Sequence, residues 1–159
     1  MTTVLRYVLS ATILGGAVFA WTTLFGQFER FLGVYHTLFR FADCIMPNPL
    51  ITPCFYGAVA FLVALGWSAY LIVRPSMRGD VWLSRLLLFG VFFALAVLGY
   101  EAAEYYKWID FGGVSVSCAP GVHPLATPCF TGLLFFGAAY ALSFAILRMR
   151  KDALSATGI

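Results

Sequence analysis

The chain has 159 residues, of which 62% are hydrophobic and 11% are charged, and its formal net charge is +3 at pH 7. Soluble domains carry about 25% charged residues. The composition therefore excludes an ordinary soluble domain and indicates a protein that exposes most of its apolar surface to lipid. The 10 Lys and Arg residues form no basic cluster with interleaved aromatic residues, which excludes a nucleic-acid-binding protein.

Four apolar runs approach the roughly 20 residues that a helix needs to cross the hydrocarbon core. They cover residues 7–28, 55–73, 82–100 and 130–147. Each run is nearly continuous, which favours helices, because the strands of a membrane barrel alternate apolar and polar residues. We therefore predict an all-α integral membrane protein, a four-helix transmembrane bundle that forms a single domain.

A ten-residue motif occurs twice in the chain. Residues 48–57 read NPLITPCFYG and residues 123–132 read HPLATPCFTG, so seven positions are identical at an offset of 75. Each copy precedes an apolar run, and its second proline suits the first turn of a helix. The duplication predicts two parallel two-span repeats, residues 1–75 and 76–159, related by an axis along the membrane normal.

The first apolar run resembles a signal peptide in one respect. It has a basic start, and Val18-Phe19-Ala20 is typical of a cleavage site. The third run is its counterpart in the second repeat, however, and a removable leader would have no such counterpart. We therefore expect the first run to be retained as a membrane span.

Basic residues are unevenly divided between the two ends of the expected spans. One end carries seven, namely Arg6, Arg74, Arg78, Arg85, Arg148, Arg150 and Lys151, and the other carries three, namely Arg30, Arg40 and Lys107. Because cytoplasmic loops are enriched in Lys and Arg, we expect both termini and the link at residues 74–80 in the cytoplasm of an inner-membrane protein. The loops at residues 29–54 and 101–129 then face outward.

The loop after the first span carries apolar residues at helical spacing, namely Phe31, Val34, Tyr35, Leu38 and Phe41. This spacing predicts that the first span continues as an amphipathic helix along the outer interface. Residues 101–110 are the expected equivalent after the third span, and Gly112 and Gly113 should end it.

Small residues recur at four-residue spacing in the spans, which allows helix backbones to approach closely. The sets are Ala60, Ala64 and Ser68, then Gly137, Ala141 and Ala145, with the pairs Gly16 and Ala20, and Gly90 and Ala94. We expect these sets to lie at helix–helix contacts.

All four cysteines, Cys44, Cys54, Cys118 and Cys129, fall on the expected outer side. That side of an inner membrane is oxidising, so we expect two disulfides that staple the outer loops. Four cysteines allow three connectivities. Loop-closure entropy favours the short loops Cys44–Cys54 and Cys118–Cys129, and the repeat symmetry is compatible with all three.

The same cysteines also permit a redox function. Four membrane spans with two outer cysteine pairs resemble, in outline, vitamin K epoxide reductase and the bacterial disulfide-forming quinone reductases. The resemblance implies a quinone cofactor and makes all four cysteines redox candidates. The chain lacks the Cys-x-x-Cys motif that poises a reactive pair in those families, and spacings of 10 and 11 positions favour structural bridges.

Two acidic residues share a repeat position at the outer ends of the first and third spans, Glu29 and Glu104. Carboxylates at membrane depth are candidates for function. The neighbouring Arg30 and Lys107 favour the alternative of ion-paired helix ends.

The two histidines, His36 and His123, are the remaining polar candidates. His123 lies six residues before Cys129, and Asn48 occupies its place in the first repeat. We count His123 with the two glutamates as a candidate polar site. The spacing of the histidines and cysteines is not typical of zinc ligands, so no metal site is predicted.

The sequence favours a small non-catalytic accessory or scaffold subunit that packs against a larger membrane protein complex. Few ionisable groups are available for catalysis, and 18% of the residues are aromatic. One alternative is a thiol–disulfide/quinone oxidoreductase that acts through Cys54 and Cys129. Another is a small transporter with a path lined by Ser68, Ser143 and the paired glutamates.

Overall fold

The computed structural model describes residues 2–39, 48–108 and 121–156, and the regular secondary structure in these residues is all helical. The long helices are α1 (Thr2–Tyr35), α2 (Pro53–Val73), α3 (Met77–Tyr105) and α4 (Pro128–Ala156). Two short 3-10 helices, η1 (Pro49–Ile51) and η2 (Pro124–Ala126), precede α2 and α4. The predicted all-helical class is confirmed.

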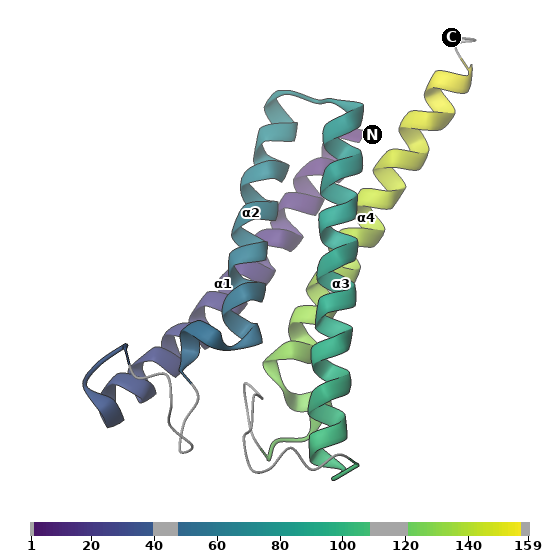
Figure 1. Cartoon of the computed structure of the whole chain (residues 1–159). Coiled ribbons are helices and arrows are strands. Elements are labelled where there is room, and N and C mark those ends of the chain that lie inside the picture. The colour runs from purple at the N-terminus through teal and green to yellow at the C-terminus, as the bar shows by residue number, and fades with distance from the viewer. Residues whose placement is uncertain (1, 40–47, 109–120, 157–159) are drawn as a thin grey trace.

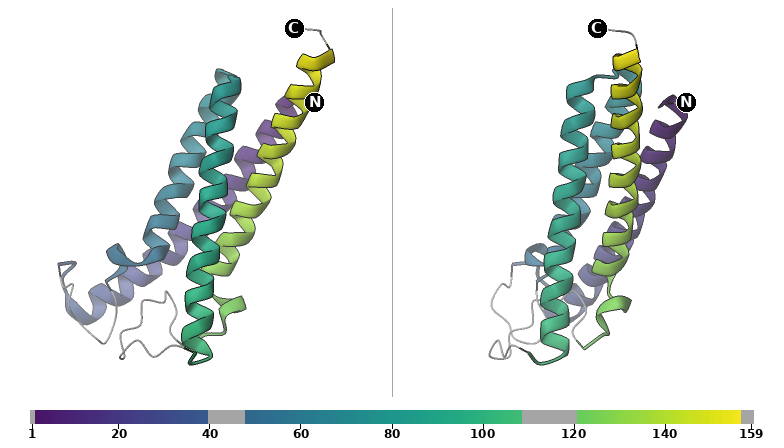
Figure 2. Two further views of the ribbon diagram at one scale, coloured as in Figure 1. Left: turned by 45° about the vertical axis from the view of Figure 1, so that its right-hand side comes forward. Right: turned by 90° about the vertical axis from the view of Figure 1, so that its right-hand side faces the viewer.

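The four long helices run alternately up and down and form one bundle (Figure 1). Helix α1 packs against α2 and α4, and α3 packs against the same two helices. Both chain ends and the link between α2 and α3 lie at one end of the bundle, as the side views also show (Figure 2). The two 3-10 helices lie at the other end, which we call the cysteine end because Cys54 and Cys129 are there.

Each long helix is long and apolar enough to cross a membrane. The most apolar window of each has a mean hydropathy between 1.7 and 2.3, yet only 22–28% of that window is buried inside the bundle. Large apolar side chains therefore point outward, such as Phe89 and Phe92 of α3, which are 67% and 61% exposed. This outward apolar surface suits lipid and suggests a multi-pass membrane protein.

Two phenylalanines that are 75 positions apart, the offset between the two motif copies, stack in the core. The rings of Phe61 and Phe136 stack with their centroids 4.0 Å apart and an interplanar angle of 17°. A Cβ added to Gly16 of α1 would lie 2.5 Å from the Phe61 ring, and one added to Gly90 of α3 would lie 2.5 Å from the Phe136 ring. Each ring is therefore held between the other ring and a glycine of the neighbouring helix.

Helices α1 and α3 extend beyond the predicted spans but end sooner than the amphipathic pattern predicts. Helix α1 stops at Tyr35, where His36 takes a left-handed φ of 53°, and Lys107 follows α3 with a φ of 54°. A left-handed residue is a common way to end a helix. Residues 36–39 do not continue helix α1, so the predicted helical extension is absent in this stretch. Phe41 and residues 109–113 lie outside the described residues.

The small residues lie at helix contacts in α2 but not in α4. Ala64 and Ser68 are buried. In α4, by contrast, Ala141 is exposed, and a Cβ added to Gly137 would meet no atom within 4 Å. The prediction for the α4 set is wrong, because this helix docks through a neighbouring stripe that contains Phe136, Ala139, Ser143 and Ile146.

Candidate functional site

The two copies of the motif adopt the same local structure. Asn48 and His123 cap η1 and η2 by accepting hydrogen bonds from the backbone N–H of the residue two positions on. The Thr52 hydroxyl donates to the Pro49 carbonyl oxygen at 2.7 Å, and the Thr127 hydroxyl donates to that of Pro124 at 2.8 Å. Both threonines are extended, which is the conformation that a following proline favours.

This local structure places both motif cysteines at the start of a helix. Pro53 and Pro128 are the first residues of α2 and α4, so Cys54 and Cys129 are the second. Each cysteine therefore lies in the first turn of its helix, at the cysteine end of the bundle.

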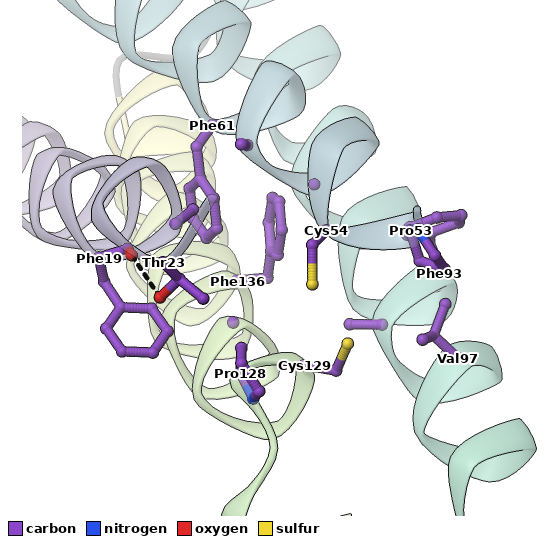
Figure 3. A pocket seen from close by; sticks show the side chains of 15 residues that line it. Phe19, Thr23, Pro53, Cys54, Phe61, Phe93, Val97, Pro128, Cys129 and Phe136 are labelled. Carbon is purple, nitrogen blue, oxygen red and sulfur yellow. Dashed lines mark hydrogen bonds between the residues drawn. The ribbon is translucent and has the colours of Figure 1, made fainter. Parts of the chain in front are cut away.

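The bundle brings these two cysteines together. Cys54 and Cys129 approach to 4.1 Å, and their sulfur atoms point toward one another in Figure 3. A disulfide bond is about 2.05 Å long, so the two residues are close without being bonded to each other. Cys44 and Cys118 lie outside the described residues, and the Cys44–Cys54 and Cys118–Cys129 pairing therefore stays a prediction.

A buried carboxyl group lies beside this pair. Glu101 of α3 is only 4% exposed, and its side chain is hydrogen-bonded to the thiol of Cys129. A carboxylate in contact with a thiol can accept its proton, so the pair has the parts of a nucleophile and its base.

A small apolar pocket opens next to the sulfur atoms (Figure 3). Its volume is about 50 Å³, and all four long helices contribute to its wall. Four phenylalanines supply most of the bulk, namely Phe19, Phe61, Phe93 and Phe136, and the space is left by the small residues Ala20, Gly57, Ala58, Ala94 and Gly132. Gly57 and Gly132, the last residues of the two motif copies, both line this pocket, and a Cβ added to either would meet no atom within 4 Å.

The other predicted site residues are dispersed. Glu29 is exposed on α1, and Glu104 lies on α3 one turn beyond Glu101, with a buried Oε2 that has no hydrogen-bond partner among the described residues. His123 accepts from the Leu125 N–H and contacts the Tyr105 ring at 5.4 Å. Among the described residues, no hydrogen bond or ion pair joins Glu29, Glu104 and His123 into one site.

The two serines of the transporter alternative lie in the packed core. Ser68 is 3% exposed and shares a hydrogen bond with Ser10 of α1, and Ser143 is 2% exposed. The stacked rings of Phe61 and Phe136 belong to the pocket wall. Neither serine lines the pocket beside the cysteines, and the transporter alternative stays a prediction.

Glu101 is a candidate site residue that the sequence analysis did not identify. The duplication directed attention to Glu104, because its counterpart Glu29 is also acidic, whereas Gly26 corresponds to Glu101. The helical stripe of α3 carries the signal that could have found it. Its buried positions Leu83, Leu87, Gly90 and Ala94 continue at helical spacing to Glu101.

The opposite end of the bundle holds a second cluster that the sequence reasoning used only for orientation. Asp80, in the first turn of α3, accepts two hydrogen bonds from Nη2 of Arg6, at 2.9 Å to Oδ1 and 2.7 Å to Oδ2. Nη1 of Arg150 in α4 also donates to Asp80 Oδ2. Asp80 and Arg6 are 5% and 7% exposed, and the Arg150 side chain is 28% exposed, so two buried charges and one partly exposed charge form the group.

Comparison of the chain with protein-family models, curated proteins and solved structures found no match.

Proposed function

We propose that the protein is a thiol–disulfide oxidoreductase of the inner membrane that relays a disulfide between its two halves through Cys54 and Cys129. The approach of these two cysteines to 4.1 Å carries the proposal. They come from opposite halves of the proposed duplication. Thiol–disulfide exchange between them would therefore link the predicted Cys44–Cys54 and Cys118–Cys129 disulfides.

The proposed setting is a membrane in which the cysteine end faces the oxidising outer side. All four helices are apolar enough to span it, and the seven basic residues of the opposite end favour a cytoplasmic position for both termini. Helix α1, with 34 residues, is about 50 Å long, so its last turns can extend past a hydrocarbon core of about 30 Å. We also propose that the two halves are parallel repeats, with the Phe61–Phe136 stack near their axis.

The proposed reaction is an exchange that conserves atoms and electrons. The thiolate of Cys129 attacks the sulfur of Cys54 in the predicted Cys44–Cys54 disulfide, and Cys44 leaves as a thiolate that takes up a proton. The Cys118 thiolate then attacks Cys129, which forms the Cys118–Cys129 disulfide and releases Cys54 as a thiolate. After protonation of Cys54, two electrons and two protons have passed from the Cys118–Cys129 pair, which is oxidised, to the Cys44–Cys54 pair, which is reduced.

The proposed role of Glu101 is to take the proton of Cys129. The carboxyl group is hydrogen-bonded to this thiol and is almost fully buried, so water cannot readily replace it. A positioned base of this kind typically contributes about 10²–10⁴-fold to a rate. Because the attacking species in disulfide exchange is the thiolate, this proton transfer precedes the bond formation.

A quinone is the proposed class of external two-electron acceptor. It would oxidise one dithiol pair to a disulfide and leave as the hydroquinone, taking up two electrons and two protons. The apolar aromatic wall next to the sulfur atoms suits such a ring. The volume of about 50 Å³ is well below the roughly 300 Å³ of common ligand sites, so the helix ends have to part before a ring can enter.

The test is turnover by the purified protein in liposomes, with a reduced dithiol peptide as donor and a short-chain quinone as acceptor. We expect Cys54→Ser and Cys129→Ser to stay folded and to lose at least about 10²-fold in rate. Thr131→Ser is the matched control, since it lies near Cys129, outside the pocket wall, and leaves every cysteine in place. Full activity of either cysteine variant would reject the proposal.

A second arm replaces the quinone by oxidised glutathione. Turnover with both acceptors supports the relay and the quinone together. Turnover with glutathione alone keeps the exchange step and rejects the quinone. The two parts of the proposal therefore fail separately.

The accessory-subunit role is the second candidate, and one observation favours it. Tyr106 and Trp108 stack at 5.6 Å near the cysteine end, and they are 52% and 75% exposed. Exposed aromatic side chains are common anchors of protein interfaces. Co-purification in mild detergent of a larger membrane complex that is lost with Trp108→Ala, while both motif cysteines prove dispensable for activity, would favour this role over the relay.

A further inference from the structure

The charged cluster at the end opposite the cysteines adjoins a pocket that the relay does not use. The pocket has a volume of about 190 Å³ and is lined by Thr3, Arg6, Ile72, Pro75 and Arg150. These residues come from α1, α2, the link and α4, so the pocket lies where three helix ends and a turn meet.

The charges around the pocket do not cancel. Asp80 is bound by Arg6 and Arg150 together, which leaves one net positive charge in the group of three. Arg6 is fixed on both sides, because its Nη1 donates to the Leu71 carbonyl oxygen while Nη2 holds Asp80. A partly buried positive charge without a counterion is costly. The surplus charge therefore favours an anion in the adjoining space.

Arg150 is the residue best placed to reach such an anion. Its side chain is 28% exposed, against 9% for that of Arg6, and it lines the pocket while binding Asp80 with Nη1. A guanidinium has five N–H donors in a planar fork, so donors remain after the contact to Asp80. The Thr3 hydroxyl and the first turn of α1, whose peptide N–H groups also favour anions, lie at the same pocket.

We propose that this pocket binds a phosphate group, with Arg150 as its principal donor and the Arg6–Asp80 pair as its support. Planar arginine donors match the oxygens of a phosphate well. The group has two possible sources, a free phosphate ion and the head group of an anionic phospholipid. The position at the ends of four apolar helices is compatible with both, because it is where head groups of a surrounding bilayer would lie.

The experiment measures binding to the purified full-length protein in an uncharged detergent. One arm titrates inorganic phosphate by calorimetry. The other arm uses nanodiscs of phosphatidylcholine with or without phosphatidylglycerol and counts retained lipid by native mass spectrometry. Saturable binding of phosphate identifies a site for the free ion, whereas retention of phosphatidylglycerol alone identifies a lipid site.

Arg150→Gln should weaken the observed binding by about tenfold or more, the usual effect of losing a charged hydrogen bond. Arg148→Gln is the matched control, because it removes the same charge two residues away from an exposed side chain that stacks on Phe144 at 5.6 Å. It should change affinity by less than about twofold. Arg150→Lys keeps the charge that faces Asp80 and serves as a second variant if the glutamine variant does not fold.

Two results would overturn the proposal. The first is an absence of saturable binding in both arms with the wild-type protein. The second is an equal loss of affinity in the Arg148 and Arg150 variants, which would mean that the basic end attracts anions only through its overall charge.

Discussion

At the end that carries both termini, the helices are joined by a buried aspartate between two arginines, whereas at the cysteine end they meet around two sulfur atoms and an apolar pocket. The charged cluster links α1, α3 and α4, and Trp67 of α2 adds a hydrogen bond to the Gly79 carbonyl oxygen at 3.2 Å. All four helices are thus pinned to one another at that end.

The cysteine end lacks the Asp80 ion pairs of the opposite end and is held by contacts around the two cysteines. The thiol–carboxyl hydrogen bond of Cys129 and Glu101, the pocket and the approach of Cys54 all lie there. We infer a division of roles in which one end fixes the helix arrangement and the other carries the reaction. The Phe61–Phe136 stack forms part of the pocket wall at the cysteine end.

The largest expected effect on stability belongs to the charged end. Asp80→Asn leaves Arg6 buried without a counterion and should destabilise the protein by about 3–5 kcal/mol, the usual result of breaking a buried ion pair. Denaturant titration in mixed micelles measures it. Asp152→Asn is the control, since it removes an exposed carboxylate from the same end and should change stability by less than about 0.5 kcal/mol. Similar effects of both variants would contradict the fixing role of the cluster.

A smaller effect is expected at the Phe61–Phe136 stack. Gly90→Ala places a methyl group 2.5 Å from the Phe136 ring, and because that ring is stacked on Phe61 it cannot move freely. We expect a loss of about 1–3 kcal/mol from overpacking. Gly99→Ala lies on the same helix with no atom within 4 Å of the new methyl group, so it should be neutral or slightly stabilising. A reversal of this order would mean that the two rings are not held as described.

The smallest effect on stability and a large effect on rate are expected for Glu101→Gln. The amide can still hydrogen-bond to Cys129, so the loss of stability should stay below about 1 kcal/mol. It cannot take the thiol proton, and the exchange rate should fall by about 10²-fold. Stopped-flow alkylation of Cys129 and turnover in liposomes measure the effect. Glu104→Gln, one turn along α3, should leave the rate unchanged, and equal losses in both variants would remove Glu101 from the reaction.

The helices could be predicted from the sequence because each is a long apolar run with proline before its start or a polar link beside it. The predicted run at residues 55–73 matches α2, which begins two residues earlier, at Pro53. Helix ends were harder to predict, since the end of α1 depends on a left-handed φ at His36 that no glycine marks.

The site could be predicted only in part. The motif identified Cys54 and Cys129, but their approach depends on how α2 and α4 pack, which spacing along the chain does not determine. Glu101 was missed because its partner is a residue of another helix. The pairing of Asp80 with two arginines was missed for the same reason, although the sequence predicted that the three residues share one end of the bundle.

The most direct test of the relay is to map disulfides after rapid acid quenching of membranes that hold the wild-type protein or the double variant Cys44→Ser, Cys118→Ser. The account predicts a Cys54–Cys129 peptide that appears transiently in the wild type during oxidation. In the double variant, which lacks both outgoing partners, the same peptide should accumulate and should disappear on reduction. If Cys54 and Cys129 stay as separate thiols in the double variant, and the wild type yields only Cys44–Cys54 and Cys118–Cys129 at every time point, the two cysteines do not exchange and the relay is contradicted.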